Sequence, residues 1–186
     1  KREDFTNLPI FTIDSASTKD IDDAVHIEKL ENGYRLGVHI ADVSFYVRGG
    51  TDSDSDAYKR GTSIYFGNNV IPMLPQIFSN DVCSLNEKSR RLAFSCVMDM
   101  DKDGNVTNYR FVKSLIYSRV KGVYSEINAI LAGEADEKIK EKYAEVYDEI
   151  FLGKELYDIL RKKHIRRGSM DIESEEAYFI FDETGK

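Results

Sequence analysis

The stretch AVHIEKLENGYRLGVHI, residues 24–40, decides the fold because it predicts a complete β-hairpin. Two segments rich in apolar residues, Ala24–Leu30 and Tyr34–Ile40, lie on either side of Glu31-Asn32-Gly33. An Asn-Gly pair between two such segments is a strong signal for a tight hairpin turn. We therefore start from two antiparallel strands and ask what the rest of the chain adds to them.

Further strand patterns lie on both sides of this hairpin. A short apolar segment, Ile10–Ile13, precedes it, and Ser63–Phe66 follows it. A second hairpin is predicted from Leu92–Met100 and Asn105–Ile116, which are separated by a short polar turn. Between these patterns, the segment VIPMLPQIFSN at residues 70–80 contains two prolines and is expected to be irregular.

The second half of the chain changes to a helical period. Residues 125–132 are predicted to be a helix, and apolar residues at helical spacing predict one long amphipathic helix from 138 to about 163. A shorter helix is expected at Asp54–Arg60, with Gly61 as its end. Ala177–Asp182 has the pattern of a last strand. These elements predict an α+β fold, with a mixed, mostly antiparallel sheet and helices packed on it.

Composition limits the classes of function. The 186 residues are 41% hydrophobic and 32% charged, as expected for a soluble globular protein with one domain. No apolar segment approaches the length needed to span a membrane, so no membrane partner is expected. Cys83 and Cys96 are too few for a disulfide framework and indicate reduced thiols in a cytoplasmic protein. The net charge of −7 argues against a protein that coats nucleic acid through bulk positive charge.

An acidic cluster lies immediately before the first hairpin, in TIDSASTKDIDDA at residues 12–24. Asp14, Asp20, Asp22 and Asp23 are so close in sequence that their like charges repel one another unless a cation joins them. Oxygen ligands without His or Cys suit a hard cation, Mg²⁺ or Mn²⁺. Four carboxylates suit a two-metal site for phosphodiester hydrolysis. The alternative is a solvated acidic loop whose aspartates cap turns.

A second acidic motif resembles a calcium site only superficially. Asp52, Asp54 and Asp56 match the first ligand positions of an EF-hand loop. The glycine and glutamate that such a loop needs are replaced by Ala57 and Ser63, so we reject a calcium site here. A helix with an acidic first turn is the better interpretation.

Basic and histidine side chains give weaker signals. Basic residues are clustered at 88–91 and at 161–167. The second cluster lies near the expected end of a helix, where the helix dipole favours cations, and phosphate binding is the alternative role. His26 and His39 alternate with apolar residues in the predicted strands, so we expect them to be packing or surface groups.

Several motifs together resemble one known family. They are TIDSASTKDIDDA at 12–24, GVHIADVSFYV at 37–47, RGTSIYF with VIPMLP and CSLN within 60–86, and RRGSMDIESEEAYFIFD at 166–182. The combination resembles the RNB catalytic domain of the ribonuclease II and ribonuclease R family, and the ribonuclease R branch more closely than the other. The resemblance begins near Phe5 and covers nearly the whole chain.

The resemblance implies a hydrolytic, processive 3′→5′ exoribonuclease that depends on Mg²⁺, or on Mn²⁺, and needs no small-molecule cofactor. Its partner would be single-stranded RNA and its products nucleoside 5′-monophosphates. The metal-site aspartates of the family fall on all four members of the acidic cluster, and the one most critical for catalysis falls on Asp22. The aromatic residues that contact RNA in the family fall on Tyr65 and Tyr124, where core packing is the alternative role. Ser15 and Glu87 depart from the family pattern, and neither is a proposed ligand.

The resemblance also implies that residues 1–186 form the N-terminal portion of an RNB catalytic domain. Cold-shock and S1 domains, and a later segment of the catalytic domain with paired glutamates and an arginine, have no counterpart in this sequence. A folded chain that binds RNA or metal without cleaving RNA is therefore the main alternative. A phosphodiesterase with another substrate, such as DNA, is a second, and a calcium-binding structural module is a third. The sequence leaves the oligomeric state open.

Overall fold

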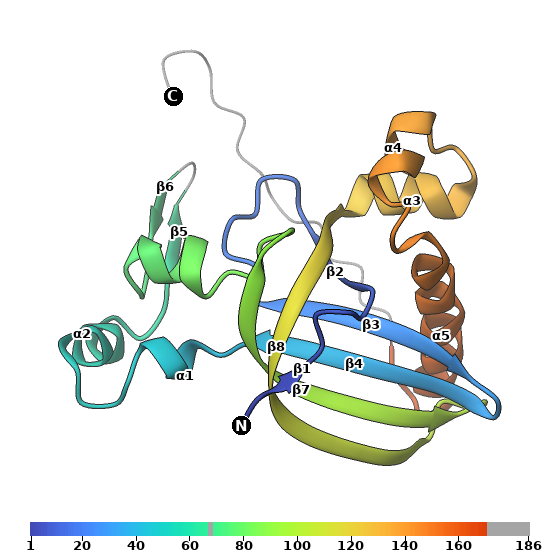
Figure 1. Ribbon diagram of the computed structural model, residues 1–186, viewed down its shortest axis with the longest axis horizontal. Helices are drawn as coiled ribbons and strands as arrows, with labels where there is room; N and C mark the ends of the chain where they lie inside the picture. The colour runs from blue at the N-terminus through green and yellow to red at the C-terminus, as the bar shows by residue number, and fades with distance from the viewer. Residues whose placement is uncertain (67–68, 171–186) are drawn as a thin grey trace.

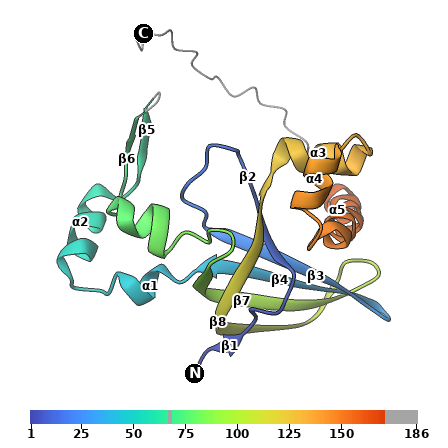
Figure 2. The same ribbon diagram turned by 45° about the horizontal axis from the view of Figure 1, so that its top comes forward.

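The computed structural model describes residues 1–66 and 69–170. Its main feature is a sheet with the strand order β1-β8-β2-β3-β4-β7, in which β8 also pairs with β7. This additional pairing joins β2, β3, β4, β7 and β8 into a closed ring of strands (Figure 1, Figure 2). The strands are β1 (Glu3–Asp4), β2 (Ile10–Asp14), β3 (Asp23–Leu30), β4 (Gly33–Ala41), β7 (Arg90–Asp101) and β8 (Val106–Val123).

Both predicted hairpins are present and lie side by side in the sheet. β3 and β4 pair antiparallel as far as Leu30 and Gly33, which leaves a tight turn between them. Gly33 is needed at this position because a Cβ atom would lie 1.9 Å from the carbonyl oxygen of Met100 on β7. β7 and β8 form the second hairpin, and β8 then runs parallel to β2. The sheet is therefore mixed and mostly antiparallel, as predicted.

A smaller part of the chain, the arm, leaves the sheet between β4 and β7. The arm consists of α1 (Val43–Tyr46), α2 (Asp52–Arg60), β5 (Ile64–Phe66) paired with β6 (Asn69–Ile71), and a π-helix, η1 (Ile77–Val82). α2 begins at Asp52, so the second acidic motif does begin a helix, as predicted. The helix ends at Gly61, which has a φ of 72°. The expectation that residues 70–80 are irregular was wrong, because β6 and the π-helix occupy much of this segment.

The second half of the chain supplies α3 (Tyr124–Ala132), α4 (Glu137–Lys142) and α5 (Tyr147–Arg166). The single long helix predicted from residue 138 is in fact divided into α4 and α5. Tyr143 and Val146 lie in the turn between these helices and are fully buried. The Tyr143 hydroxyl accepts a hydrogen bond from the Val123 amide at 2.9 Å and donates one to Glu126 at 2.5 Å. These contacts hold Tyr143 between α3 and the end of β8, and the helix is interrupted there although the apolar spacing is helical throughout.

The hydrophobic core has two parts. One lies between the sheet and the helices and includes Tyr143, Ile150 and Leu156. The other lies beneath the acidic loop and includes Ile21 and Leu85. In the part of the chain that the structure describes, no helix is long and apolar enough to cross a membrane. The strand predicted at 177–182 lies outside the described residues.

Candidate functional site

The acidic loop, residues 14–23, connects the end of β2 to the start of β3. Asp14 is the last residue of β2, and Asp23 is the first residue of β3. Because these strands are antiparallel neighbours, their connected ends lie at the same end of the sheet. Asp20 and Asp22 lie on the connection itself. The structure therefore brings the four predicted metal ligands to one end of the sheet.

The four carboxylates influence one another electrostatically. Asp22 is exposed to solvent, but desolvation by the surrounding protein still raises its pKa, and the negative charges of Asp20, Asp23 and Asp14 raise it further. Burial also raises the pKa of Asp14, which the neighbouring Thr12 side chain and the Lys121 charge lower and the charges of Asp23 and Asp20 raise further. The Oδ2 atom of Asp14 is buried and has no hydrogen-bond partner among the described residues. Because an unpaired buried carboxylate oxygen is costly, a cation at this position would relieve both the repulsion and the missing contact.

The carboxylates fit an open site for a hard cation better than a closed one. Their oxygen atoms are the ligand type that Mg²⁺ and Mn²⁺ prefer. Within residues 1–66 and 69–170, no group of three or more His, Cys, Asp or Glu side chains is placed so that together they could hold a metal ion. Mg²⁺ commonly takes only one or two protein carboxylates and completes its coordination with water and substrate phosphate. The acidic loop suits that kind of site and does not suit a closed calcium or zinc site.

Lys121, which the sequence analysis missed, supplies a positive charge beside the acidic loop. Its ammonium group donates hydrogen bonds to the carbonyl oxygens of Ala16 at 3.1 Å and Thr18 at 2.5 Å. The parallel pairing of β2 with β8 brings it there, since Asp14 lies opposite Val123. No local sequence pattern connects a lysine on β8 with an aspartate on β2. Lys121 holds the loop in place through its backbone and leaves the carboxylates available for a ligand.

A cleft of about 670 Å³ separates the acidic loop from the arm. Lys19 and Asp20 line it from the loop, and Tyr65, Pro72 and Asn80 line it from the arm. The Tyr65 hydroxyl donates a hydrogen bond to Asp20 Oδ2 at 3.0 Å, and this bond raises the pKa of Tyr65. The Tyr65 residue is nevertheless 66% exposed. A predicted RNA-stacking residue thus contacts a predicted metal ligand and also presents its ring to the solvent.

Tyr124, the second predicted RNA-binding residue, lies at the same end of the sheet. It is the first residue of α3 and follows Val123, whose backbone lies opposite Asp14. Tyr124 is 58% exposed, so it does not pack in the core. The β2–β8 pairing, rather than any closeness in sequence, places Tyr124 near the acidic loop.

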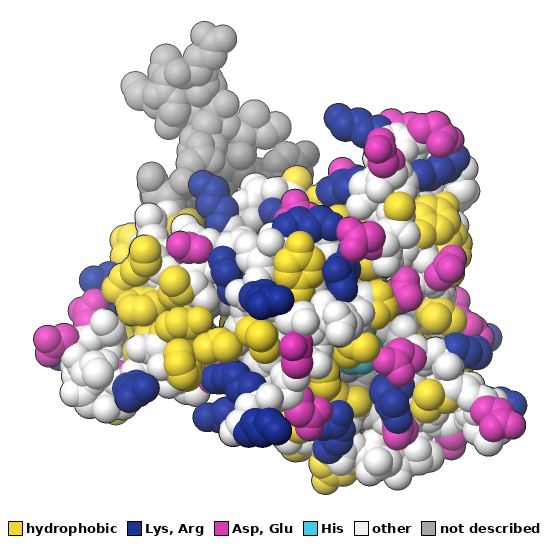
Figure 3. Space-filling model, in the orientation of Figure 1, with side chains coloured by type: hydrophobic (Ala, Val, Ile, Leu, Met, Phe, Trp, Pro, Cys, Tyr) yellow, Lys and Arg dark blue, Asp and Glu magenta, His cyan; other side chains and the backbone are white. Residues whose placement is uncertain are grey.

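Three residues of the basic clusters make structural contacts. The Lys88 ammonium forms an ion pair with Glu145, and the Arg91 guanidinium forms one with Asp81 at 3.2 Å. On α5, Lys163 donates to the Gly104 carbonyl oxygen at 2.8 Å and so joins the helix to the β7–β8 turn. In the space-filling view, hydrophobic side chains gather over the arm, and basic and acidic side chains are mixed over the sheet (Figure 3). This face therefore shows no continuous basic channel.

Comparisons with known proteins agree on one family. The sequence matches the RNB domain over residues 2–186. Ribonuclease R 1 of Lactococcus lactis is 46% identical over 185 residues, which cover 99% of this chain and 22% of that protein. Ribonuclease R of Thermotoga maritima is 45% identical over 187 residues, which cover 100% of this chain and 26% of that protein.

A solved structure gives the same result for the fold. Mycoplasma genitalium RNase R in complex with ribose methylated single-stranded RNA aligns with a TM-score of 0.91 at 29% identity. The alignment covers 99% of this chain and 28% of that protein. The chain thus spans about a quarter of the length of the relatives that it matches.

Proposed function

This chain belongs to the RNB domain family, and from that premise we propose that it carries the metal-binding part of a ribonuclease R-like exoribonuclease site. In full, the proposal is the hydrolytic, processive degradation of single-stranded RNA from its 3′ end to nucleoside 5′-monophosphates, dependent on Mg²⁺ or Mn²⁺. The observation that carries it is the acidic loop itself. Its carboxylates repel one another, one of its buried oxygens is unpaired, and it forms one wall of a cleft.

The residues of the chain have separate roles in this proposal. Asp14, Asp20, Asp22 and Asp23 would hold the cation, which when bound would activate water and stabilise the leaving oxygen of a phosphodiester. The family resemblance assigns the greatest share of the chemistry to Asp22, whose pKa is raised by desolvation and by the charges of the other three carboxylates. The exposed ring of Tyr65 stacks on a base near the 3′ end and orients the RNA in the cleft. Tyr124 contributes to seating the terminal nucleotide.

The direct test is degradation of single-stranded RNA labelled at its 5′ end, with Mg²⁺ or with EDTA. We expect products that shorten from the 3′ end only when Mg²⁺ is present. Asp22→Asn should reduce the rate by a factor on the order of 10²–10³ or more, as when a comparable transition-state contact is lost. The matched control is Asp103→Asn, because Asp103 is an exposed aspartate in the β7–β8 turn and should leave the rate unchanged.

Other outcomes would favour the alternative functions. An Asp22→Asn variant with normal activity would show that the metal assignment is wrong. A folded chain that binds RNA without cleaving it would favour a binding role instead of a catalytic one. Equal degradation of DNA would favour a general phosphodiesterase, because a site that contacts the 2′-hydroxyl rejects DNA.

A further inference from the structure

The acidic loop is supported from below by the segment Cys83–Asn86, which follows the π-helix. Ser84 in this segment is 1% exposed. Its hydroxyl donates a hydrogen bond to the Lys19 carbonyl oxygen at 2.8 Å and accepts one from the Ile21 amide at 3.0 Å. One side chain therefore fixes the backbone on both sides of Asp20 and immediately before Asp22.

A backbone contact reinforces the same position. The Leu85 amide donates to the Ile21 carbonyl oxygen at 2.9 Å. Ile21 and Leu85 are almost completely buried in the core cluster beneath the loop. Because both backbone groups of Ile21 are held by the segment 83–86, the Ile21 side chain points into the core. Its neighbours Asp20 and Asp22 remain outside, since Asp20 is half-buried and Asp22 is exposed.

We propose that Ser84 is a positioning residue that sets the spacing of the Asp20 and Asp22 carboxylates for cation binding. This inference rests on the proposed function and adds to it a residue that is not itself a ligand. A side chain at this position must both donate and accept a hydrogen bond, which a hydroxyl does and an alkyl group cannot. Loss of the hydroxyl would leave the buried Ile21 amide and the partly buried Lys19 carbonyl oxygen without this partner and release the loop between two proposed ligands.

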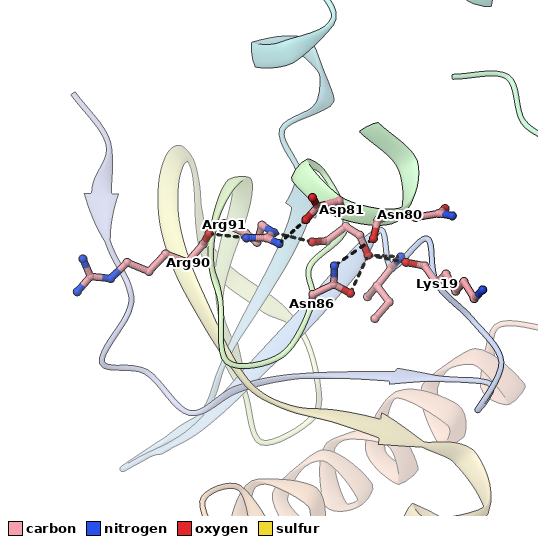
Figure 4. A network of polar contacts seen from close by, with 8 residues as sticks. Lys19, Asn80, Asp81, Asn86, Arg90 and Arg91 are labelled. Atoms are coloured by element: carbon pink, nitrogen blue, oxygen red, sulfur yellow. Dashed lines mark hydrogen bonds and ion pairs between the residues drawn. The ribbon is translucent and has the colours of Figure 1, made fainter. Parts of the chain in front are cut away.

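The segment that holds the acidic loop is also joined to the opposite wall of the cleft. The Asn86 side-chain amide donates to the carbonyl oxygen of Asn80 on the π-helix at 3.2 Å. Arg91 donates to the Ser84 carbonyl oxygen at 2.9 Å and to Asp81 at 3.2 Å (Figure 4). Both walls of the cleft are thus held by the same few residues. Ser84 consequently positions the ligands relative to the cleft as well as to each other.

The test is Mn²⁺ binding by the protein without RNA, measured from the electron paramagnetic resonance signal of the free ion. Ser84→Ala should weaken Mn²⁺ binding by about 10-fold, at the lower end of the range for residues that orient metal ligands. Ser84→Thr keeps the hydroxyl and should restore most of the affinity. The matched control is Ser118→Ala, because Ser118 is equally buried and its hydroxyl makes a long contact of 3.4 Å with the Val120 carbonyl oxygen.

A second measurement in EDTA tests the loop without any cation. Hydrogen exchange of the Ile21 amide should become about 10-fold faster in Ser84→Ala and stay unchanged in Ser118→Ala, because only the first loses its acceptor. If Ser84→Ala does not fold, Ser84→Cys keeps the side-chain volume with a weak hydrogen-bonding group and should show the same losses.

The outcomes separate this inference from the proposed function. Wild-type Mn²⁺ affinity in Ser84→Ala, or an equal loss in Ser118→Ala, would overturn the positioning role. If the wild-type protein binds no Mn²⁺, the proposed function is wrong and the exchange of Ile21 alone decides whether Ser84 holds the loop. Unchanged exchange in that case would overturn the inference as well.

Discussion

Two polar clusters each include one residue of β3, His26 in the first and Asp23 in the second, and they differ in how completely the protein satisfies their polar groups. The first is the histidine–serine cluster, formed by His26, His39, Ser95 and Ser114 inside the ring of strands. His26 Nδ1 lies 2.8 Å from His39 Nε2, and His39 Nδ1 lies 2.7 Å from Ser95 Oγ. Ser95 Oγ lies 2.7 Å from Ser114 Oγ. All four residues are almost completely buried, and each has a partner.

The second cluster is the acidic loop, which ends at Asp23, three residues before His26. Its members repel one another, and the buried oxygen of Asp14 has no protein partner within the described part of the chain. A buried polar cluster that is complete in itself contributes to a rigid core. A cluster that lacks a partner indicates a ligand that the protein does not supply. Under the proposed function, the first cluster therefore serves the fold and the second serves the binding of a cation.

The largest effect is expected from breaking the complete cluster. His39→Ala would leave a cavity and remove a partner from both His26 and Ser95. We expect the free energy of unfolding to fall by about 4 kcal/mol, the sum of a cavity and of unpaired buried groups. Urea unfolding in EDTA measures this loss. A loss below about 1 kcal/mol would contradict the structural role of the cluster.

The control for this substitution is His164→Ala, because His164 is exposed near the end of α5. Its removal should change the free energy of unfolding by less than about 0.5 kcal/mol.

The histidine–serine cluster also restricts which residue can occupy position 37 on β4. A Cβ atom at Gly37 would lie 2.0 Å from the His26 ring, so the histidine pair requires a glycine opposite it.

The sequence predicts the strands and the aspartates near these clusters. It predicts little of the contacts that reach the clusters from distant parts of the chain. The first hairpin, the end of β2 and the four aspartates follow from patterns within a few residues of each other. Lys121 and Ser84 reach the acidic loop from β8 and from the segment after the π-helix, and no local pattern signals such contacts. The sequence left His26 and His39 as packing or surface groups, and only the β3–β4 register shows that both enter the ring.

The helices of the second half also show that local patterns do not report long-range contacts. The apolar spacing after residue 138 is helical throughout, so it predicts one helix. The break at Tyr143 depends on a hydrogen bond to Val123, 20 residues away, which periodicity does not report. Sequence reasoning thus singled out the four aspartates of the acidic loop, but the residues that hold the loop required the tertiary structure.

The next effect concerns the incomplete cluster, which a cation should complete. We expect Mg²⁺ to raise the free energy of unfolding of the wild-type protein, by about 2.7 kcal/mol at a concentration 100 times its Kd. Asp22→Asn should lose this increase because it removes a ligand, and Asp103→Asn should keep it. Thermal unfolding with Mg²⁺ or EDTA measures the difference. A wild-type protein that is equally stable in both would show that the loop needs no cation.

The last effect is a response to acid that has opposite signs in the two clusters. Burial lowers the pKa of His26 to about 4 and that of His39 to about 3, against 6.5 for an ordinary histidine. The unfolded chain therefore binds more protons than the folded one as pH falls below 6.5, and each histidine loses stabilising free energy in that range. For either histidine alone the loss between pH 7 and pH 5 is about 2 kcal/mol.

Acid acts on Asp14 and Asp22 in the other direction, because their folded-state pKa values are raised by burial and by like charges. The folded protein then takes up protons before the unfolded one, so stability from the loop increases as pH falls through the raised pKa values toward 3.8. Urea unfolding in EDTA at pH 7 and pH 5 should show a net loss, since the histidine window lies at higher pH. Asp22→Asn should lose slightly more than the wild type, because it removes part of the compensation. An increase in stability from pH 7 to pH 5 would mean that the acidic loop, and not the histidine–serine cluster, controls the response of the fold to acid.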